Sequence, residues 1–167
     1  MMADREILNF AFGSNLTPAR LLARLPAAQL LGTARLPGFT LGFRHLGQDG
    51  SAKCSIEPDD SAGACVHGVL YALTEQEVVQ LDRIEGEGYQ RQGVEVVRPC
   101  GSRITAHCYF TQQFYDDLLP FSWYLEHVLR GVQYHQFPAS YQQLLAKQPC
   151  TLDLDYHRAR RELSIHQ

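Results

Sequence analysis

A glutamate stands where an apolar side chain is expected, on the buried face of a predicted helix. Thr74 and Glu77 match a Thr-x-x-Glu capping box, which predicts a helix that runs to about Glu85. On that helix Val78, Leu81 and Glu85 lie at positions i, i+3 and i+7, so they share the stripe that faces the core. Burial and the negative end of the helix dipole would both raise the pKa of this carboxyl group. The pattern predicts a general acid and base, unless the carboxylate bends out to solvent or accepts neighbouring amide protons.

A second group of polar residues follows the first predicted strand. Residues 7–12 form an apolar run of strand length, and Gly13, Ser14 and Asn15 come directly before a helical segment that opens at Thr17 and Pro18. Glycine lets a ligand approach the backbone closely, and the first amides of a helix have no partner within the helix. Such a loop attracts anions and carbonyl oxygens, although Gly-Ser-Asn is also an ordinary turn sequence. No phosphate-loop pattern is present, so nucleotide binding gains no support.

The cysteines and histidines predict neither a metal site nor a catalytic thiol. The five cysteines are odd in number and include no Cys-x-x-Cys pair, and the seven histidines show no His-x-x-x-His spacing. His107 and Cys108 point to opposite faces of a predicted strand. Cys65 and His67 share a face, but no third group is predicted to orient them, so packing is the simpler interpretation. We therefore expect no metal and no cofactor.

Short strands, mostly linked by turns, and a few helices must position these residues. The strand candidates are residues 7–12, two strands within 29–45 that are divided at Pro37 and Gly38, and residues 65–73, 89–98 and 103–110. Residues 48–64 are predicted to form an exposed polar loop with at most one short strand, and no chemistry is expected there. The helix candidates are residues 18–25, residues 75–85, a segment beyond Pro120 with Trp123, Tyr124, His127, Val128 and Val132 on one side, and a segment with Tyr141, Leu144 and Leu145. This pattern predicts an α+β fold, with a small mixed, mostly antiparallel β-barrel and packed helices.

Composition limits the class of protein. A chain of 167 residues that is 45% hydrophobic is expected to form one domain, residues 1–150, with the polar residues 151–167 as a peripheral C-terminal segment. The net charge is −3 and the basic residues are scattered, so no nucleic-acid partner is predicted. The N-terminal apolar run is too short for a signal peptide or a membrane span, and unpaired thiols suit a reducing compartment. We expect a cytoplasmic protein without a membrane partner.

The two chemical groups together resemble one known family. Phe12-Gly13-Ser14-Asn15-Leu16 is followed about seventy residues later by Leu81-Asp82-Arg83-Ile84-Glu85-Gly86 and then by Tyr89. This pairing resembles the γ-glutamylcyclotransferase family, whose signature is Tyr-Gly-Ser-Asn and a Leu-Asp-x-x-Glu-Gly segment with a catalytic glutamate. The resemblance extends to about residue 150, and further matches lie at 34–36, 67–69, Tyr109, Tyr124, Gly131 and 138–144. Phe12 replaces the signature tyrosine, which removes the hydrogen bond of a phenol but keeps the backbone donors of the loop.

The resemblance implies both a fold and an activity. It implies a small barrel with a pocket at its mouth, in which a γ-glutamyl amide, such as a γ-glutamyl amino acid, is closed to 5-oxoproline with release of the free amine. It gives Glu85 the catalytic role and assigns substrate binding to Asn9, Phe10, Ala11, Phe12, Gly13, Ser14, Asn15, Tyr89 and Tyr124. It needs no metal and no organic cofactor, and it allows a homodimer, although no stretch of sequence marks an interface. The alternatives are a cyclotransferase for γ-glutamylamines and a noncatalytic binder of γ-glutamyl or other anionic metabolites.

Overall fold

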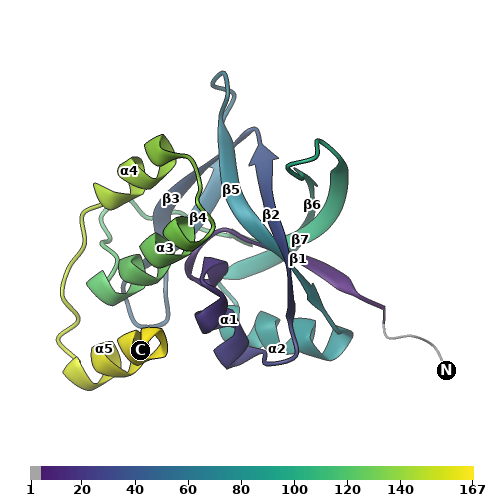
Figure 1. The fold of residues 1–167 in the computed structure, drawn as a ribbon. Helices are drawn as coiled ribbons and strands as arrows, with labels where there is room; N and C mark the ends of the chain where they lie inside the picture. Colours follow the sequence, from purple (N-terminus) through teal and green to yellow (C-terminus); the bar gives the residue numbers. More distant parts are fainter. Residues whose placement is uncertain (1–4) are drawn as a thin grey trace.

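A closed five-stranded barrel forms the centre of the structure, a computed structural model that describes residues 5–167 (Figure 1). In order around the barrel, its strands are β1 (Ile7–Ala11), β5 (Cys65–Leu73), β2 (Gln29–Pro37), β6 (Tyr89–Val97) and β7 (Arg103–Thr111). Neighbouring strands are antiparallel except β1 and β7, which are parallel and close the barrel where Asn9 lies opposite His107. The prediction of an α+β fold with a mixed, mostly antiparallel barrel is confirmed.

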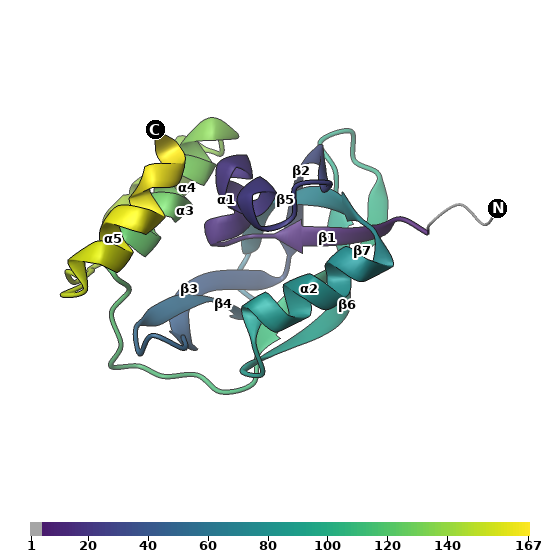
Figure 2. The ribbon, with the colours of Figure 1, turned by 90° about the horizontal axis from the view of Figure 1, so that it is seen from below.

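Helices and a second small sheet lie around this barrel. The 3-10 turn η1 (Ser14–Leu16), α1 (Pro18–Arg24) and α2 (Glu75–Glu85) lie at one end, whereas α3 (Ser122–Tyr134), α4 (Ala139–Ala146) and α5 (Tyr156–Leu163) form a layer along one side (Figure 1). A last 3-10 turn, η2 (Ser164–His166), follows α5. The second sheet is the hairpin of β3 (Phe39–Leu46) and β4 (Ala52–Pro58), which lies beside the barrel (Figure 2). The layer of helices and the hairpin thus meet the barrel near η1.

Local sequence sets the position of α2, and with it the position of Glu85. The Thr74 hydroxyl accepts from the Glu77 amide at 3.2 Å, and the Glu77 carboxylate accepts from the Thr74 amide at 2.8 Å. At the other end Gly86 adopts a φ of 88°, a conformation that glycine takes without strain, and its amide donates to the Asp82 carbonyl. The predicted capping box and the predicted C-terminus are both confirmed, so Glu85 is the last residue of the helix.

The prediction for residues 48–64 is wrong in one respect. Strand β4 occupies seven of these residues, and Ala52, Cys54, Ser55 and Ile56 on it are buried. The one short strand that the sequence allowed here is present and pairs with β3, but its burial was not predicted. The predicted division at Pro37 and Gly38 is confirmed, since β2 ends and β3 begins there; β2 pairs with β5, and β3 pairs with β4. Strand β4 is therefore a buried wall, whereas residues 58–64 are largely exposed, as predicted.

The C-terminal residues form an unexpected helix, α5, attached to α3. Asp153 is buried, and its carboxylate accepts from the Trp123 indole at 2.9 Å and from the Arg158 guanidinium at 2.6 Å. Charged and polar contacts, rather than an apolar stripe, hold this segment, which explains why hydrophobic periodicity did not reveal it. On α4 the sequence placed two leucines together, but Leu145 is buried while Leu144 is exposed. The division of the chain at residue 150 stays a prediction.

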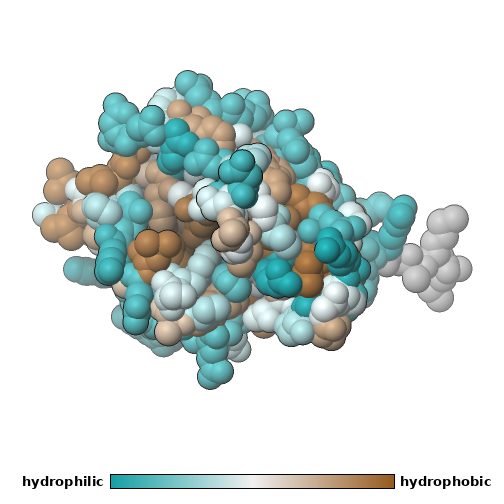
Figure 3. Space-filling model, turned by 90° about the horizontal axis from the view of Figure 1, so that it is seen from above, coloured by the Kyte–Doolittle hydropathy of each residue, from teal (hydrophilic) through white to brown (hydrophobic). Residues whose placement is uncertain are grey.

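None of the helices within residues 5–167 is long and apolar enough to cross a membrane. Viewed from above, the apolar residues form separate patches among hydrophilic ones (Figure 3). The prediction that the N-terminus carries no targeting segment also includes residues 1–4, which lie outside the described residues.

Candidate active site

One small cavity, of about 40 Å³, brings together every residue that the sequence assigned to the site. The stretch from Asn9 to Asn15, at the end of β1 and in η1, forms one wall, and Glu85, Tyr89 and Tyr124 come from α2, β6 and α3. Two further lining residues, Cys54 and Tyr109, were not predicted for this site. A partly enclosed space with a few convergent polar groups is typical of a small-molecule site.

Glu85 is held by a short chain of hydrogen bonds that begins on α1. Its Oε1 atom accepts from Asn15 Nδ2 at 3.1 Å, and Asn15 Oδ1 accepts from Arg24 Nη1 at 3.4 Å. A guanidinium can only donate, so Arg24 fixes the Asn15 amide with its NH₂ group toward the carboxylate. The Asn15 carbonyl in turn accepts from the Tyr71 hydroxyl at 2.8 Å, which fixes the main chain of η1. The carboxylate therefore has a defined direction in the cavity.

The surroundings of Glu85 shift its proton affinity toward neutrality. Removal of the carboxyl group from water raises the pKa of Glu85 above its ordinary value. The positive charges of Arg24 and Arg20 and the hydrogen bond from Asn15 lower that pKa, and they oppose desolvation without cancelling it. A carboxyl group with a raised pKa is suited both to accept and to return a proton.

Of the two tyrosine hydroxyls at the cavity, one can donate a hydrogen bond and the other can accept one. The main chain of Cys54 sets these roles. The Cys54 amide donates to Tyr124 Oη at 2.9 Å, so the Tyr124 proton remains for another partner. The Tyr89 hydroxyl donates to the Cys54 carbonyl at 2.7 Å, so its lone pairs remain. The Tyr89 ring also stacks on His45, with ring centroids 3.5 Å apart, which holds it in place. The cavity thus offers one hydroxyl donor and one hydroxyl acceptor at fixed points.

Cys54 was missed because it lies in the segment predicted as a loop. Its thiol is buried, and burial raises its pKa to about 12, so it is a neutral wall residue and not a nucleophile. A Cβ atom on Gly13 would lie 3.0 Å from the Cys54 Cβ, so the loop needs glycine to approach β4 this closely. The period-two alternation of Ala52, Cys54 and Ile56 was the available signal for a half-buried strand.

Asp82, one turn before Glu85, takes no part in the cavity. Its Oδ1 atom accepts from the Tyr109 hydroxyl at 2.6 Å and from Arg91 Nε at 3.0 Å. These contacts fix Tyr109, which lines the cavity from β7. Asp82 therefore supports the wall, and Glu85 is the carboxylate that lines the space.

A second cavity, of about 240 Å³, adjoins the first one and is lined by charged side chains. The two share Ser14, Glu85, Tyr89 and Tyr124. Three of its cations are paired with carboxylates, as Arg20 with Glu162 at 2.5 Å, Lys53 with Asp49 at 2.9 Å, and Arg158 with Asp153 at 2.6 Å. Within residues 5–167 Arg24 has no carboxylate within 4.0 Å. Arg24 is thus the cation that is free to meet an anionic ligand.

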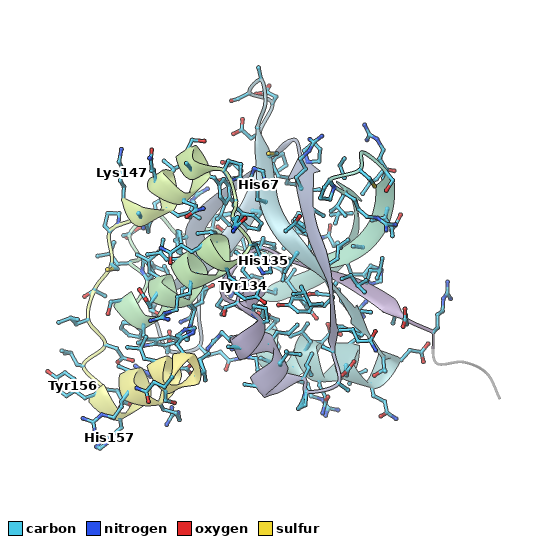
Figure 4. All side chains as sticks on the ribbon, viewed as in Figure 1. His67, Tyr134, His135, Lys147, Tyr156 and His157 are labelled. Atoms are coloured by element: carbon cyan, nitrogen blue, oxygen red, sulfur yellow. The ribbon has the colours of Figure 1, made fainter. Side chains whose placement is uncertain are left out.

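The competing thiol and imidazole pair lies elsewhere. Cys65 Sγ is 3.5 Å from His67 Nε2, as their shared strand face predicts. His67 lies between β5 and α4 near the top of Figure 4, whereas α2 lies at the opposite end. Its ring packs against Tyr141 and Phe137, which supports a packing role. Across the described range, no three His, Cys, Asp or Glu side chains are grouped as metal ligands would be.

Comparison with known proteins gives consistent relatives. The model of the AIG2-like family matches residues 65–145. Human γ-glutamylcyclotransferase is 28% identical in an alignment of 152 positions, which covers 85% of this chain and 78% of the human protein.

Solved structures match over nearly the whole chain. A γ-glutamyl cyclotransferase structure superposes with a TM-score of 0.81 at 24% identity, over 94% of this chain and 99% of that one. A structure of an uncharacterized human protein gives a TM-score of 0.80 at 25% identity, over 97% and 99% of the two chains. These comparisons agree: the chain is similar to the AIG2-like family over residues 65–145, and its structure has the γ-glutamylcyclotransferase fold.

Proposed function

We propose that the protein is a cyclotransferase that converts a γ-glutamyl amide into 5-oxoproline and a free amine, with Glu85 as the proton acceptor and donor. One observation carries this proposal. A carboxyl group with a raised pKa lines the same small cavity as the loop from Asn9 to Asn15, and the two are joined by the hydrogen bond from Asn15. The similarity to human γ-glutamylcyclotransferase supports the same reaction class.

The reaction needs a folded substrate more than a reactive group. In a γ-glutamyl amide the α-amine and the γ-carbonyl belong to one molecule, so correct folding brings the nucleophile to the carbonyl carbon. Glu85 would remove a proton from the α-ammonium, and the free amine would then attack the γ-carbon to form the five-membered ring. As the bond from the γ-carbon to the leaving nitrogen breaks, the protonated carboxyl group would return the proton to that nitrogen. The ring nitrogen still carries a second proton, which Glu85 would take and pass to the departing amine, so that the amine leaves as an ammonium. Two protons thus pass in turn through Glu85, which ends as it began.

The loop and the tyrosines would hold the γ-glutamyl unit in this conformation. The amides of Gly13 and Ser14 donate to no backbone carbonyl in the described chain, so they remain for the substrate carboxylate or the γ-carbonyl oxygen. The Tyr124 hydroxyl has a free proton for an acceptor on the substrate, and Tyr89 has free lone pairs for the ammonium. Substrate binding by these residues is the role that the sequence predicted for them.

The second cavity would receive the leaving group. It begins at Glu85, where the departing nitrogen must lie, and Arg24 stands beside it with no carboxylate partner. This arrangement favours a leaving amino acid over a leaving amine, because an amino acid brings a carboxylate to Arg24. A cyclotransferase for γ-glutamylamines is the alternative within enzymes. The cytoplasmic location and the homodimer stay predictions.

A substrate panel tests the proposal. Purified protein is incubated with γ-glutamyl dipeptides, γ-glutamylamines and glutathione, and 5-oxoproline is quantified by chromatography. We expect 5-oxoproline from at least the dipeptides, and none from the Glu85→Gln variant. Release from no member of the panel, together with measurable binding of a γ-glutamyl compound, would support a noncatalytic binder instead.

A further inference from the structure

The C-terminal helix α5 reaches the substrate-binding loop through two side chains. Glu162 on α5 is ion-paired with Arg20 on α1, with 2.5 Å between Oε2 and Nη1. The same guanidinium donates from Nε to Ser14 Oγ at 3.0 Å. Ser14 belongs to η1 and lines both cavities. A continuous chain of contacts therefore runs from residue 162 to the wall of the candidate site.

Arg20 needs a partner of this kind because it is buried. Its side chain is 9% exposed, and its guanidinium lies 5.8 Å from the centre of the Trp123 ring, which leaves little water to solvate the charge. A buried guanidinium without a carboxylate is costly, and it would also be free to turn away from Ser14. Glu162 supplies the carboxylate, and so it fixes which donor of Arg20 faces the loop.

Glu162 is itself held as an anion. It contacts His127 Nε2 at 3.5 Å, and His127 Nδ1 lies 2.7 Å from His166 Nε2 on η2. The contacts with His127 and Arg20 lower the pKa of Glu162 to about 2, and burial lowers the pKa of His127 to about 4. Near neutral pH the carboxylate is therefore charged and the buried imidazole is neutral.

The attachment of α5 does not depend on Glu162. At the start of the segment the buried Asp153 accepts from the Trp123 indole and from Arg158, as described above. Helix α5 begins next to this anchor, at Tyr156 and His157, and runs back along α3 toward α1 (Figures 2 and 4). Removal of the Glu162 charge alone should leave the helix docked.

We propose that Glu162 is a positioning residue for the candidate active site, which acts through Arg20 to fix Ser14 and the loop that would hold the γ-glutamyl group. This inference rests on the proposed function for its meaning, and on the geometry of Glu162, Arg20 and Ser14 for its support. It gives a function to residues that the sequence placed in a peripheral segment.

If Glu162 positions Arg20 and Ser14, its removal should change the pKa of Glu85, whereas a residue that only stabilises the fold would leave that pKa unchanged. The groups that face Glu85 are Asn15 of η1, Arg20 and Arg24 of α1, Cys54 of β4, Tyr89 of β6, Tyr109 of β7 and Tyr124 of α3. The groups that face Glu162 are Arg20, Arg24, Lys53, His127 and His166. Loss of the Glu162 charge leaves Arg20 uncompensated, so the positive potential at Glu85 increases. The pKa of Glu85 should fall.

The test compares Glu162→Gln with Glu126→Gln, a matched control on α3. The side chain of Glu126 is 41% exposed, and its one ion pair within residues 5–167 is with Arg130, at 2.9 Å. We expect Glu162→Gln to lower kcat/KM for 5-oxoproline formation about tenfold and to move the acidic limb of its pH profile down by about half a pH unit. Glu162→Asp should restore the position of that limb, and the control should match the wild-type protein. In a protein that already carries Ser14→Ala, Glu162→Gln should lower kcat/KM much less than it does in the wild-type protein.

Several results would overturn the inference. They are an unchanged kcat/KM, a loss of kcat/KM without movement of the acidic limb, and independent effects of Glu162→Gln and Ser14→Ala. The emission of Trp123, the single tryptophan, reports whether α5 stays docked. If Glu162→Gln does not fold, Arg20→Lys replaces it, because lysine keeps the charge but cannot hold Ser14 and Glu162 together. That variant should then lose as much kcat/KM as Ser14→Ala, and full activity would overturn the inference.

A measurement without turnover separates this inference from the proposed function. The carboxyl carbon of Glu85 can be titrated by ¹³C NMR in protein labelled at glutamate, with Glu85→Gln for assignment. A lower pKa of Glu85 in Glu162→Gln supports the positioning role even if the wild-type protein releases no 5-oxoproline. An unchanged pKa overturns it.

Discussion

Replacement of Glu85 by glutamine tests the proposed chemistry and the proposed electrostatics together. Glutamine has the same shape, and its amide oxygen can still accept from Asn15 Nδ2, which lies 3.1 Å from Oε1. The variant loses only the ability to take and return a proton. The loop, the tyrosines and the two cavities should keep their geometry.

The expected loss of activity follows from the proton transfers. A positioned general acid or base contributes about 10²- to 10⁴-fold to a rate, and the proposed mechanism uses Glu85 in both roles. We therefore expect kcat/KM for 5-oxoproline formation to fall at least about 10³-fold, equivalent to about 4 kcal/mol of transition-state stabilisation.

The expected effect on stability has the opposite sign. The pKa of Glu85 is raised in the folded protein, mainly by desolvation, so the folded state favours the protonated form. The stability contributed by that form is fully present below the unfolded-state pKa and is lost as the pH rises through the folded-state pKa. At pH 7 the partly buried carboxylate is thus a destabilising group. Its replacement should leave the free energy of unfolding unchanged or raise it by about 1 kcal/mol.

The assay measures 5-oxoproline by chromatography and unfolding by urea titration at pH 5 and pH 7. Glu87→Gln serves as a control, because Glu87 is an exposed residue two positions further along the chain. Its activity should equal that of the wild-type protein. If Glu85→Gln keeps more than a tenth of the wild-type kcat/KM, Glu85 is not the proton-transferring group. If the variant is markedly less stable at pH 7 than the wild-type protein, the carboxylate is not a desolvated group.

Three further substitutions test the surroundings of Glu85. Arg24→Gln removes the cation that most lowers the pKa of Glu85, so the acidic limb of the kcat/KM profile should move to higher pH. The loss of activity should be larger for a γ-glutamyl amino acid than for the matching γ-glutamylamine. Equal losses for the two substrates would exclude Arg24 as a carboxylate contact. Gly13→Ala places a Cβ 3.0 Å from Cys54 Cβ and 3.4 Å from Tyr124 Oη. This substitution should lower the free energy of unfolding, measured by urea titration, by about 1–3 kcal/mol and should raise KM. An unchanged free energy of unfolding together with an unchanged KM would refute the close packing. Tyr124→Phe leaves the Cys54 amide without its acceptor, which should cost about 1–3 kcal/mol in the same titration, whereas a loss below about 0.5 kcal/mol would show that the amide finds water.

Much of the fold near the site could be predicted, because local signals determine it. The capping box fixes the register of α2, and the register places Glu85 beside Val78 and Leu81 on the inward face. The apolar run of β1, followed by Gly13, places the loop at the end of a strand. The pairing of these two segments in the sequence carried the family resemblance, which the comparisons support.

The rest depended on contacts between distant residues. The parallel pairing of β1 with β7 closes the barrel, and no local pattern specifies which strand ends meet. The burial of strand β4 was not predicted, although it carries Cys54, whose main chain orients two tyrosines. Helix α5 depends on ion pairs such as that between Arg20 and Glu162, which are 142 residues apart. Charged partners at such separations leave no periodic signal in the sequence.

The main chain of Cys54 also gives the cavity a handedness. Its amide and its carbonyl each use one tyrosine hydroxyl, so Tyr124 presents a proton and Tyr89 presents lone pairs, and the two cannot exchange roles. With the amides of the loop as a third contact, the α-carbon of a glutamyl group would be held by three different neighbours. Three distinct contacts around one tetrahedral carbon can distinguish mirror images. A γ-D-glutamyl compound could satisfy only two of them at once, so this cavity should discriminate between enantiomers by geometry alone.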